Sequence, residues 1–294
     1  MQVPSYVEYE RATSVEHALT LLGRPDHRVL AGGHSLIPMM KLRLAQPGVL
    51  VDINGLAELA YIKEDGGQLR IGALARHADL LDSQLAGQHF PIFHDAERVV
   101  ADPIVRLWGT IGGSLCQADP SEDLSAVFAA VRATAVIRSQ DGDRQVPVRE
   151  FHRGPYETVV GPGELLAEIR VPVPAPAHGG TGSAYEKVAR RVGDWSVAAA
   201  AAMLQLDHGT VEQAGIGLTA VGAEHFVAAE AEDFLRGRLA TEQNFEQAAE
   251  IAAEHCHPVA DQRGPEDYKR HLVAELTTRA LRRARERATA RATA

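Results

Sequence analysis

The chain has 294 residues, of which 45% are hydrophobic, so it is long enough for two domains and apolar enough to bury a core. Its formal net charge of −9 argues against nonspecific nucleic-acid binding, which needs a basic face. No apolar run approaches the roughly 20 residues of a membrane-spanning helix, and the N-terminal residues lack the pattern of a signal peptide. We therefore expect a cytoplasmic protein.

The first predicted elements form a compact unit of strand, glycine turn, short helix and strand. Ser14 is typical of an N-cap, and it precedes a helix over residues 15–22. A strand over residues 28–31 runs directly into Gly32 and Gly33, a helix covers residues 36–44, and a second strand covers residues 49–53. A helix between two strands favours parallel pairing of those strands.

The middle of the chain alternates short strands and helices. A turn over residues 64–67 leads into a strand over residues 69–72. Helical periodicity follows over residues 77–85, 91–100 and 124–133, and a strand is predicted over residues 135–139. Asp141-Gly142-Asp143 indicates a hairpin turn after that strand.

Alternating prolines in residues 171–180 mark a change of character. Proline is excluded from helix interiors and from central strands, so we expect an extended connector here and a domain boundary between residues 1–175 and 176–290. Beyond it we predict strands over residues 197–206 and 211–221 and helices over residues 245–255 and 268–287.

The cysteine count restricts the chemistry of this chain. Cys116 and Cys256 are the two cysteines, which excludes a disulfide framework and a four-cysteine iron–sulfur cluster built from this chain alone. The nearest approach to a metal motif is His255-Cys256-His257. Adjacent side chains point to different sides of an element, so we interpret this stretch as a helix end before Pro258 and predict no metal site.

Two glycine pairs are the strongest candidates for a binding site. The first, in residues 31–35, follows a strand, and the second, in residues 110–114, is flanked by Thr110 and Ser114. Glycine allows positive φ and close approach of a ligand, and free N–H groups at such turns bind phosphate. Each pair alone is typical of an ordinary turn. Two such loops in one domain fit a pyrophosphate held from two sides, although neither loop is a Rossmann or P-loop motif.

Asp123 allows two interpretations. An acidic residue near such loops accepts hydrogen bonds from ribose or ribityl hydroxyls in dinucleotide sites. The alternative is an N-cap on the helix that starts at Leu124. The sequence pattern favours neither.

These motifs resemble a known family. The loops are similar to the AGGxS and TIGGN signatures of the flavoprotein (medium) subunits of aerobic carbon monoxide dehydrogenases and of the FAD domain of xanthine dehydrogenases. The resemblance covers nearly the whole chain and includes further short matches in the same order, at residues 31–38, 101–103 with Arg106, 163–166, 185–187, 193–195, 215–219 and 264–268. It implies an α+β fold: a PCMH-type (vanillyl-alcohol-oxidase-like) FAD-binding domain of two α/β subdomains, and a smaller α+β carbon monoxide dehydrogenase flavoprotein C-terminal domain.

The resemblance also implies a set of FAD contacts and no catalytic residue on this chain. The residues expected to surround the pyrophosphate are Ala31, Gly32, Gly33, His34, Ser35, Leu36 and Ile37 from the first loop, and Thr110, Ile111, Gly112, Gly113 and Ser114 from the second. The other expected contacts are Asp123, Leu165 or Leu166 as an apolar contact, Lys187 near the isoalloxazine, and Trp195 against the ring.

Two positions depart from the family pattern. Ser114 stands where the signature has asparagine, which removes or shortens one amide contact, and Trp195 stands where carbon monoxide dehydrogenase subunits carry tyrosine. Tryptophan keeps an aromatic face but lacks the phenol O–H. The alternative for Trp195 is packing in the core, although Gly193-Asp194 before it favours a flavin contact, and from the residues alone Lys187 could lie on a solvated face.

The resemblance implies a role in electron transfer between subunits. FAD would accept electrons from [2Fe–2S] clusters on a small subunit and pass them to a quinone or other acceptor, while a large molybdopterin subunit oxidises the substrate. The expected assembly is a dimer of heterotrimers, at most peripherally associated with the inner face of the membrane. Two alternatives remain: a medium subunit of another molybdenum hydroxylase, acting on a nicotine-like, purine or other N-heterocycle or on an aldehyde, and a non-redox nucleotide-binding or scaffold protein.

Overall fold

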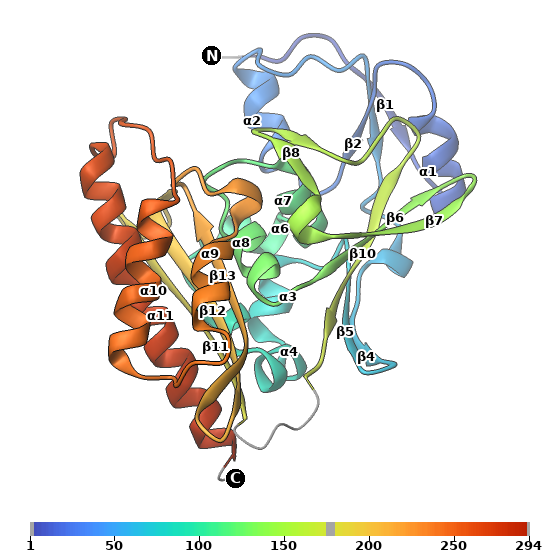
Figure 1. Ribbon diagram of the computed structural model, residues 1–294. Helices are drawn as coiled ribbons and strands as arrows, with labels where there is room; N and C mark the ends of the chain where they lie inside the picture. The colour runs from blue at the N-terminus through green and yellow to red at the C-terminus, as the bar shows by residue number, and fades with distance from the viewer. Residues whose placement is uncertain (1–2, 175–179, 293–294) are drawn as a thin grey trace.

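A computed structural model of the chain describes residues 3–174 and 180–292 (Figure 1). The N-terminal part contains two larger sheets, a small two-stranded sheet and several short helices, and the C-terminal part contains one sheet with two long helices on its outer face. Within the described residues, three clusters of buried apolar side chains form the core.

The first sheet confirms the predicted parallel unit. Its strands are β1 (Glu8–Arg11), β3 (Val49–Asp52) and β2 (His27–Leu30), in that spatial order and all parallel. Helix α1 (Val15–Leu22) begins as predicted, because the Ser14 hydroxyl accepts the His17 N–H at 3.1 Å. Helix α2 (Leu36–Lys41) ends earlier than predicted, since Arg43 adopts a left-handed conformation with φ of 62°.

The second sheet is antiparallel and has the strand order β4-β5-β10-β6-β7. Its strands are β4 (Ile62–Asp65), β5 (Gln68–Gly72), β6 (Thr134–Ser139), β7 (Gly142–Pro147) and β10 (Leu165–Pro172). The predicted hairpin is present, but its turn is residues 140–141 because Ser139 pairs with Gly142. Strand β10 was not predicted, since Glu168, held by Arg70 and Arg170, interrupts its apolar pattern.

Short helices connect the strands of the second sheet. They are α3 (His77–Asp82), α4 (Gln84–His89), α5 (Pro91–Glu97), α6 (Pro103–Trp108), α7 (Ile111–Gln117) and α8 (Asp123–Ala130). The helix predicted over residues 77–85 is broken at Ser83, which is extended and caps α4 by accepting the Ala86 N–H. The short elements η1 (Ala57–Leu59), η2 (Val148–Glu150), β8 (His152–Gly154) and β9 (Glu157–Thr158) complete this part.

The proline-rich stretch begins inside a strand. Pro172 is the last residue of β10 and is in register with Gln68, so the extended segment starts after it rather than at Val171. A proline is tolerated at a strand end, where its missing N–H interrupts little of the ladder. Residues 175–179 of the predicted connector lie outside the described residues.

The C-terminal sheet is an antiparallel meander of β11 (Thr181–Ala189), β12 (Ser196–Asp207) and β13 (Thr210–Thr219). Helices α10 (Glu242–Glu254) and α11 (Glu266–Ala292) cover its outer face, and η3 (Glu224–Phe226) and α9 (Ala229–Leu235) follow β13 (Figure 1). The other face packs on α8, and a Cβ on Gly215 or Gly217 would lie within 2.0 Å of the Ala130 or Ala126 carbonyl oxygen. This close contact brings the start of α8 beside β11 and β12.

Candidate functional site

A cavity of about 790 Å³ lies between the N-terminal sheets and the start of the C-terminal sheet. Its volume falls within the range of about 300–1,000 Å³ that is common for small-molecule and cofactor sites. Both glycine loops line it, together with residues 160–166 and, from the C-terminal part, Lys187 and residues 193–195. Segments far apart in the sequence therefore share one wall.

The first glycine loop offers free hydrogen-bond donors to this cavity. Gly33 has φ of +75°, a left-handed conformation that favours glycine. Within the described part of the chain, the N–H groups of residues 33–36 donate no hydrogen bond, while the Gly33 carbonyl accepts the Ile37 N–H at 3.0 Å. A row of unpaired N–H groups around a left-handed residue is an anion site.

The second glycine loop differs, because its donors are already used. Thr110 caps α7, and its hydroxyl accepts the Gly113 N–H at 3.2 Å. The N–H groups of Ile111 and Gly112 donate to the Ala75 and Ala73 carbonyls at 2.9 Å, and the Ser114 N–H donates to the Thr110 carbonyl. This loop therefore bounds the cavity, but these backbone N–H groups are already bound within the protein.

Glycine is required in both loops by contacts within the protein. A Cβ on Gly32 would lie 2.2 Å from the Trp108 carbonyl oxygen, and one on Gly112 would lie 2.6 Å from the Ala73 Cβ. Real Cβ atoms do not approach backbone this closely, so these glycines allow the loop backbones to pack against neighbouring chain. The cavity shape depends on that packing.

Glu122 caps α8, so the interpretation of Asp123 as the N-cap is wrong. The buried Glu122 carboxylate accepts the N–H groups of Leu124 at 2.8 Å and Ser125 at 2.7 Å. It also accepts the Ser114 hydroxyl at 2.7 Å, so the serine that departs from the family signature is bound to protein. Burial raises the pKa of Glu122, and the hydrogen bonds from Ser125 and Ser114 oppose this. Sequence reasoning missed Glu122, because glutamate is not a typical N-cap.

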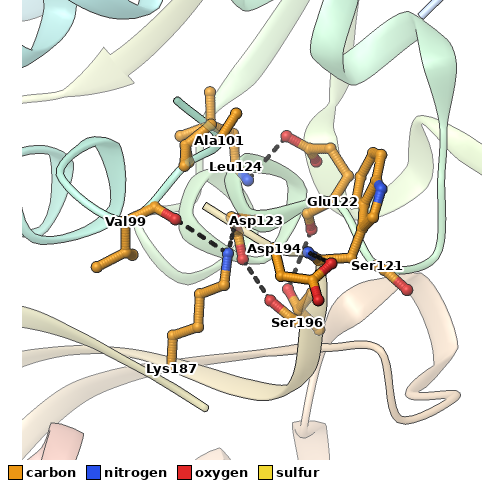
Figure 2. A network of polar contacts seen from close by, with 12 residues as sticks. Val99, Ala101, Ser121, Glu122, Asp123, Leu124, Lys187, Asp194 and Ser196 are labelled. Atoms are coloured by element: carbon orange, nitrogen blue, oxygen red, sulfur yellow. Dashed lines mark hydrogen bonds and ion pairs between the residues drawn. The ribbon is translucent and has the colours of Figure 1, made fainter. Parts of the chain in front are cut away.

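Asp123 and Lys187 form a buried ion pair across the two parts of the chain (Figure 2). Lys187 Nζ lies 2.7 Å from Asp123 Oδ2 and also donates to the Val99 carbonyl at 3.2 Å. The other carboxylate oxygen of Asp123 accepts the hydroxyls of Tyr185 at 2.5 Å and Ser196 at 2.6 Å. Burial and the nearby Asp123 carboxylate raise the pKa of Tyr185 well above its ordinary value. The Lys187 side chain is 4% exposed, which overturns the alternative of a solvated face.

Trp195 lies in the cavity wall and is 45% exposed, so it is not a core residue. The preceding Asp194 fixes the turn by accepting the Trp195 N–H at 2.9 Å. Gly193 packs on the segment before α6, since its Cβ would lie 2.9 Å from the Ala101 carbonyl oxygen. This contact holds the turn with Trp195 at the edge of the cavity.

A buried histidine–glutamate pair supports the second loop. His77 Nδ1 lies 2.9 Å from Glu97 Oε2, and the His77 N–H donates to the Gly109 carbonyl at 3.3 Å. Burial by itself lowers the pKa of His77, but the adjacent Glu97 carboxylate outweighs it, so the pKa is raised. The pair was not predicted, because nothing in the local pattern links residues 20 positions apart.

Comparison with known proteins identifies the family. A family model described as FAD binding domain in molybdopterin dehydrogenase matches residues 5–174, and one described as CO dehydrogenase flavoprotein C-terminal domain matches residues 183–284. The chain belongs to the FAD-binding medium subunits of the molybdenum hydroxylases. This confirms the predicted family, its FAD cofactor and its two-domain α+β fold.

Two relatives of this medium subunit and one solved structure illustrate the likeness. The carbon monoxide dehydrogenase medium chain of Hydrogenophaga pseudoflava is 40% identical, covering 95% of this chain and 97% of that protein. The glyceraldehyde dehydrogenase medium chain of Sulfolobus acidocaldarius is 36% identical over 95% of this chain and 98% of that protein. The solved structure of carbon monoxide dehydrogenase from Hydrogenophaga pseudoflava lacking the Mo-pyranopterin moiety matches with a TM-score of 0.93 and 41% identity, covering 97% of this chain and 99% of that one.

The medium subunit brings most of the predicted contacts together. The predicted residues that line the cavity are Ala31, Gly32, Gly33, His34, Ser35, Leu36, Thr110, Gly112, Gly113, Ser114, Asp123, Leu165, Leu166, Lys187 and Trp195. Ile37 and Ile111 are not among the residues that line the cavity, and a contact of either residue with FAD stays a prediction. Ile111 is fully buried in the core, and Ile37 belongs to the first turn of α2.

The cavity of the medium subunit fits FAD by the chemistry of its walls. The free N–H groups of residues 33–36 suit a pyrophosphate, and Trp195 offers an aromatic face at the part of the wall that comes from the C-terminal sheet.

No helix among the described residues is long and apolar enough to cross a bilayer.

Proposed function

We propose that this chain is the medium subunit of a carbon monoxide dehydrogenase and relays electrons from [2Fe–2S] clusters on a small subunit to a quinone or another acceptor. The observation that carries the proposal is the joint presence, in one cavity, of the free N–H groups of residues 33–36 and of Lys187 and Trp195. The 40% identity to a carbon monoxide dehydrogenase medium chain over nearly its full length supports the substrate.

Each part of the wall has a distinct role in this proposal. Residues 33–36 bind the pyrophosphate through their N–H groups, and Leu165 and Leu166 provide an apolar surface for the cofactor. Trp195 lies against the isoalloxazine. Bound FAD supplies a centre that takes up and releases electrons singly or in pairs, and the protein sets its position and electrostatics.

Lys187 acts in this proposal as half of a pair. Its charge is offset by the Asp123 carboxylate at 2.7 Å, so the two side chains together add little net charge beside the cofactor. Both oxygens of Asp123 already accept protein donors. Asp123 therefore contributes mainly by fixing Lys187, and any direct contact with FAD uses a remaining lone pair.

The proposed assembly places the substrate chemistry on other chains. This chain has two cysteines, so the clusters belong to a small iron–sulfur subunit, and a large molybdopterin subunit oxidises the substrate. We propose a dimer of heterotrimers in the cytoplasm, peripherally associated with the inner face of the membrane where it reduces quinone. The proposal also divides this chain into residues 1–175 and 176–290, which is supported by an apolar cluster that lies wholly within the second part, although the main cluster of the first part also includes Tyr185, Ala199, Ala201 and Met203.

The test uses the complex purified after co-expression of the three subunits. We expect a flavin absorbance band near 450 nm and dye reduction that depends on carbon monoxide. The 36% identity to a glyceraldehyde dehydrogenase medium chain makes an aldehyde the main competing substrate, so glyceraldehyde is tested in parallel with nicotine and a purine. Turnover of one of these and not of carbon monoxide would replace the proposed substrate. A complex without flavin absorbance after FAD reconstitution would favour a non-redox role.

A further inference from the structure

Arg28 is a cavity residue that no sequence motif indicated. It lies on β2, five residues before Gly33, and it lines the cavity. Its side chain takes part in no hydrogen bond or ion pair with another residue that the structure describes. An arginine without a partner in a cofactor cavity is available to a ligand.

The charges of the wall distinguish Arg28 from the other cations. Three arginine or lysine residues among the described residues line the cavity, namely Arg24, Arg28 and Lys187. Arg24 lies 3.7 Å from the Glu10 carboxylate, and Lys187 is paired with Asp123. Among the arginine and lysine residues of the described wall, Arg28 is therefore the one whose charge is not offset by a carboxylate within 4.0 Å.

Arg28 is exposed and lies on β2, the strand that runs into the first glycine loop. Side chains alternate along a strand, and Val29 and Ala31 pack against an apolar cluster, so Arg28 faces the other way. Cys116, on the helix that starts in the second loop, also lines the cavity. Burial raises the pKa of the Cys116 thiol to about 12, and the positive charge of Arg28 opposes this.

A pyrophosphate in this cavity needs more than the first loop provides. The N–H groups of Ile111, Gly112, Gly113 and Ser114 are all bound within the protein, so this loop supplies no free donor from these positions. Two phosphate charges taken from water require cationic or donor partners. A guanidinium is suited to phosphate oxygens, because its planar N–H groups match two of them at once.

We propose that Arg28 pairs with the pyrophosphate of FAD and completes, with the N–H groups of residues 33–36, the anion site of this subunit. The inference rests on the proposed function, since it concerns the same cofactor. The negative charge of the pyrophosphate is then recognised on one side of the cavity, by the strand that contains Arg28 and the loop that contains Gly33. The second loop then limits the shape of the site.

The test compares the FAD dissociation constants of the unmodified complex and of complexes that carry Arg28→Gln, Arg28→Lys or Arg138→Gln. FAD is removed from each purified complex and titrated back at low and at high salt. We expect Arg28→Gln to weaken FAD binding by about 10- to 100-fold, the range for a lost charge-assisted hydrogen bond. Arg28→Lys keeps the charge but loses the planar pair of donors, so it should recover part of the affinity. Arg138→Gln is the control, because it removes an arginine that lies outside the cavity wall and is paired with Asp143, and it should change affinity less than about threefold.

Salt dependence separates charge from packing. FAD binding to the unmodified complex should weaken as salt rises, and this dependence should be smaller in Arg28→Gln. Unchanged affinity in Arg28→Gln, no recovery in Arg28→Lys, or an equal loss in Arg138→Gln would each overturn the assignment. If the unmodified complex fails to bind FAD, the proposed function itself is wrong, and the inference falls with it.

Discussion

Lys187 of β11 and Asp123 at the start of α8 lie 64 positions apart in the sequence and form an ion pair of 2.7 Å. Their side chains are only 4% and 7% exposed, so the pair is screened little by solvent. The pair joins the first turn of α8, which belongs to the N-terminal part, to the sheet of the C-terminal part, beneath the cavity. The cofactor site and the contact between these parts therefore share the same residues.

Asp123→Asn should destabilise the protein strongly. The substitution leaves the Lys187 ammonium buried without its carboxylate, and removing one partner of a buried pair costs about 3–5 kcal/mol. Urea unfolding of the purified protein measures the free energy of unfolding. Asp143→Asn removes the carboxylate of the exposed Arg138–Asp143 pair and should change that free energy by less than about 1 kcal/mol. Equal effects of the two variants would contradict a buried pair.

Gly32→Ala should deplete the protein of FAD. The added Cβ would meet the Trp108 carbonyl oxygen at 2.2 Å, and overpacking against backbone costs about 1–3 kcal/mol and displaces one loop from the other. The ratio of flavin to protein absorbance in the purified complex reports the loss. Gly154→Ala is the control, since a Cβ there meets nothing within 4 Å, and it should retain the full ratio. Full flavin in Gly32→Ala would show that the loop contact is not required.

Trp195→Ala and Trp108→Ala should have different effects on the flavin. Both side chains are exposed, at 45% and 57%, but only Trp195 lines the cavity. Loss of an aromatic contact worth about 0.5–1.5 kcal/mol should weaken FAD binding by about two- to tenfold and alter the flavin absorbance in Trp195→Ala. Circular dichroism of both variants should match the unmodified protein. An unaltered flavin in Trp195→Ala would remove this residue from the site.

His152 should make stability depend on pH in the acid range. Burial lowers the pKa of His152 from 6.5 to about 4. The hydrogen bond to the Leu115 carbonyl acts in the opposite direction, but its effect is smaller than that of burial. Between these two values the unfolded state binds a proton that the folded state does not, so stability falls as pH decreases through this range, by about 3 kcal/mol at most. The contribution is fully present above pH 6.5.

Urea unfolding between pH 7 and 4 tests the His152 prediction. His152→Gln should flatten the fall in stability, because no group then takes up that proton on unfolding. His255→Gln removes an exposed histidine and should leave the slope unchanged. The same slope in all three proteins would assign the pH dependence to other groups.

The sequence by itself determined the local elements and the identity of the first glycine loop. The helix over residues 15–22, its Ser14 cap and the parallel strands on either side of Gly32 and Gly33 follow from periodicity and turn chemistry between near neighbours. The count of two cysteines likewise excludes a four-cysteine iron–sulfur cluster built from this chain alone. Each of these depends on residues close together in the chain or on a count.

The tertiary structure decided which groups are used and which remain free. The sequence presents two similar glycine pairs, yet the N–H groups of Ile111 and Gly112 are taken by Ala75 and Ala73, while those of residues 33–36 stay open to the cavity. The partners of Asp123 come from β11 and β12, and Glu122 takes the capping role that its neighbour was expected to have. A hydrogen-bonding group pairs with whatever the fold packs against it, and local sequence carries no information about a partner 60 or more positions away.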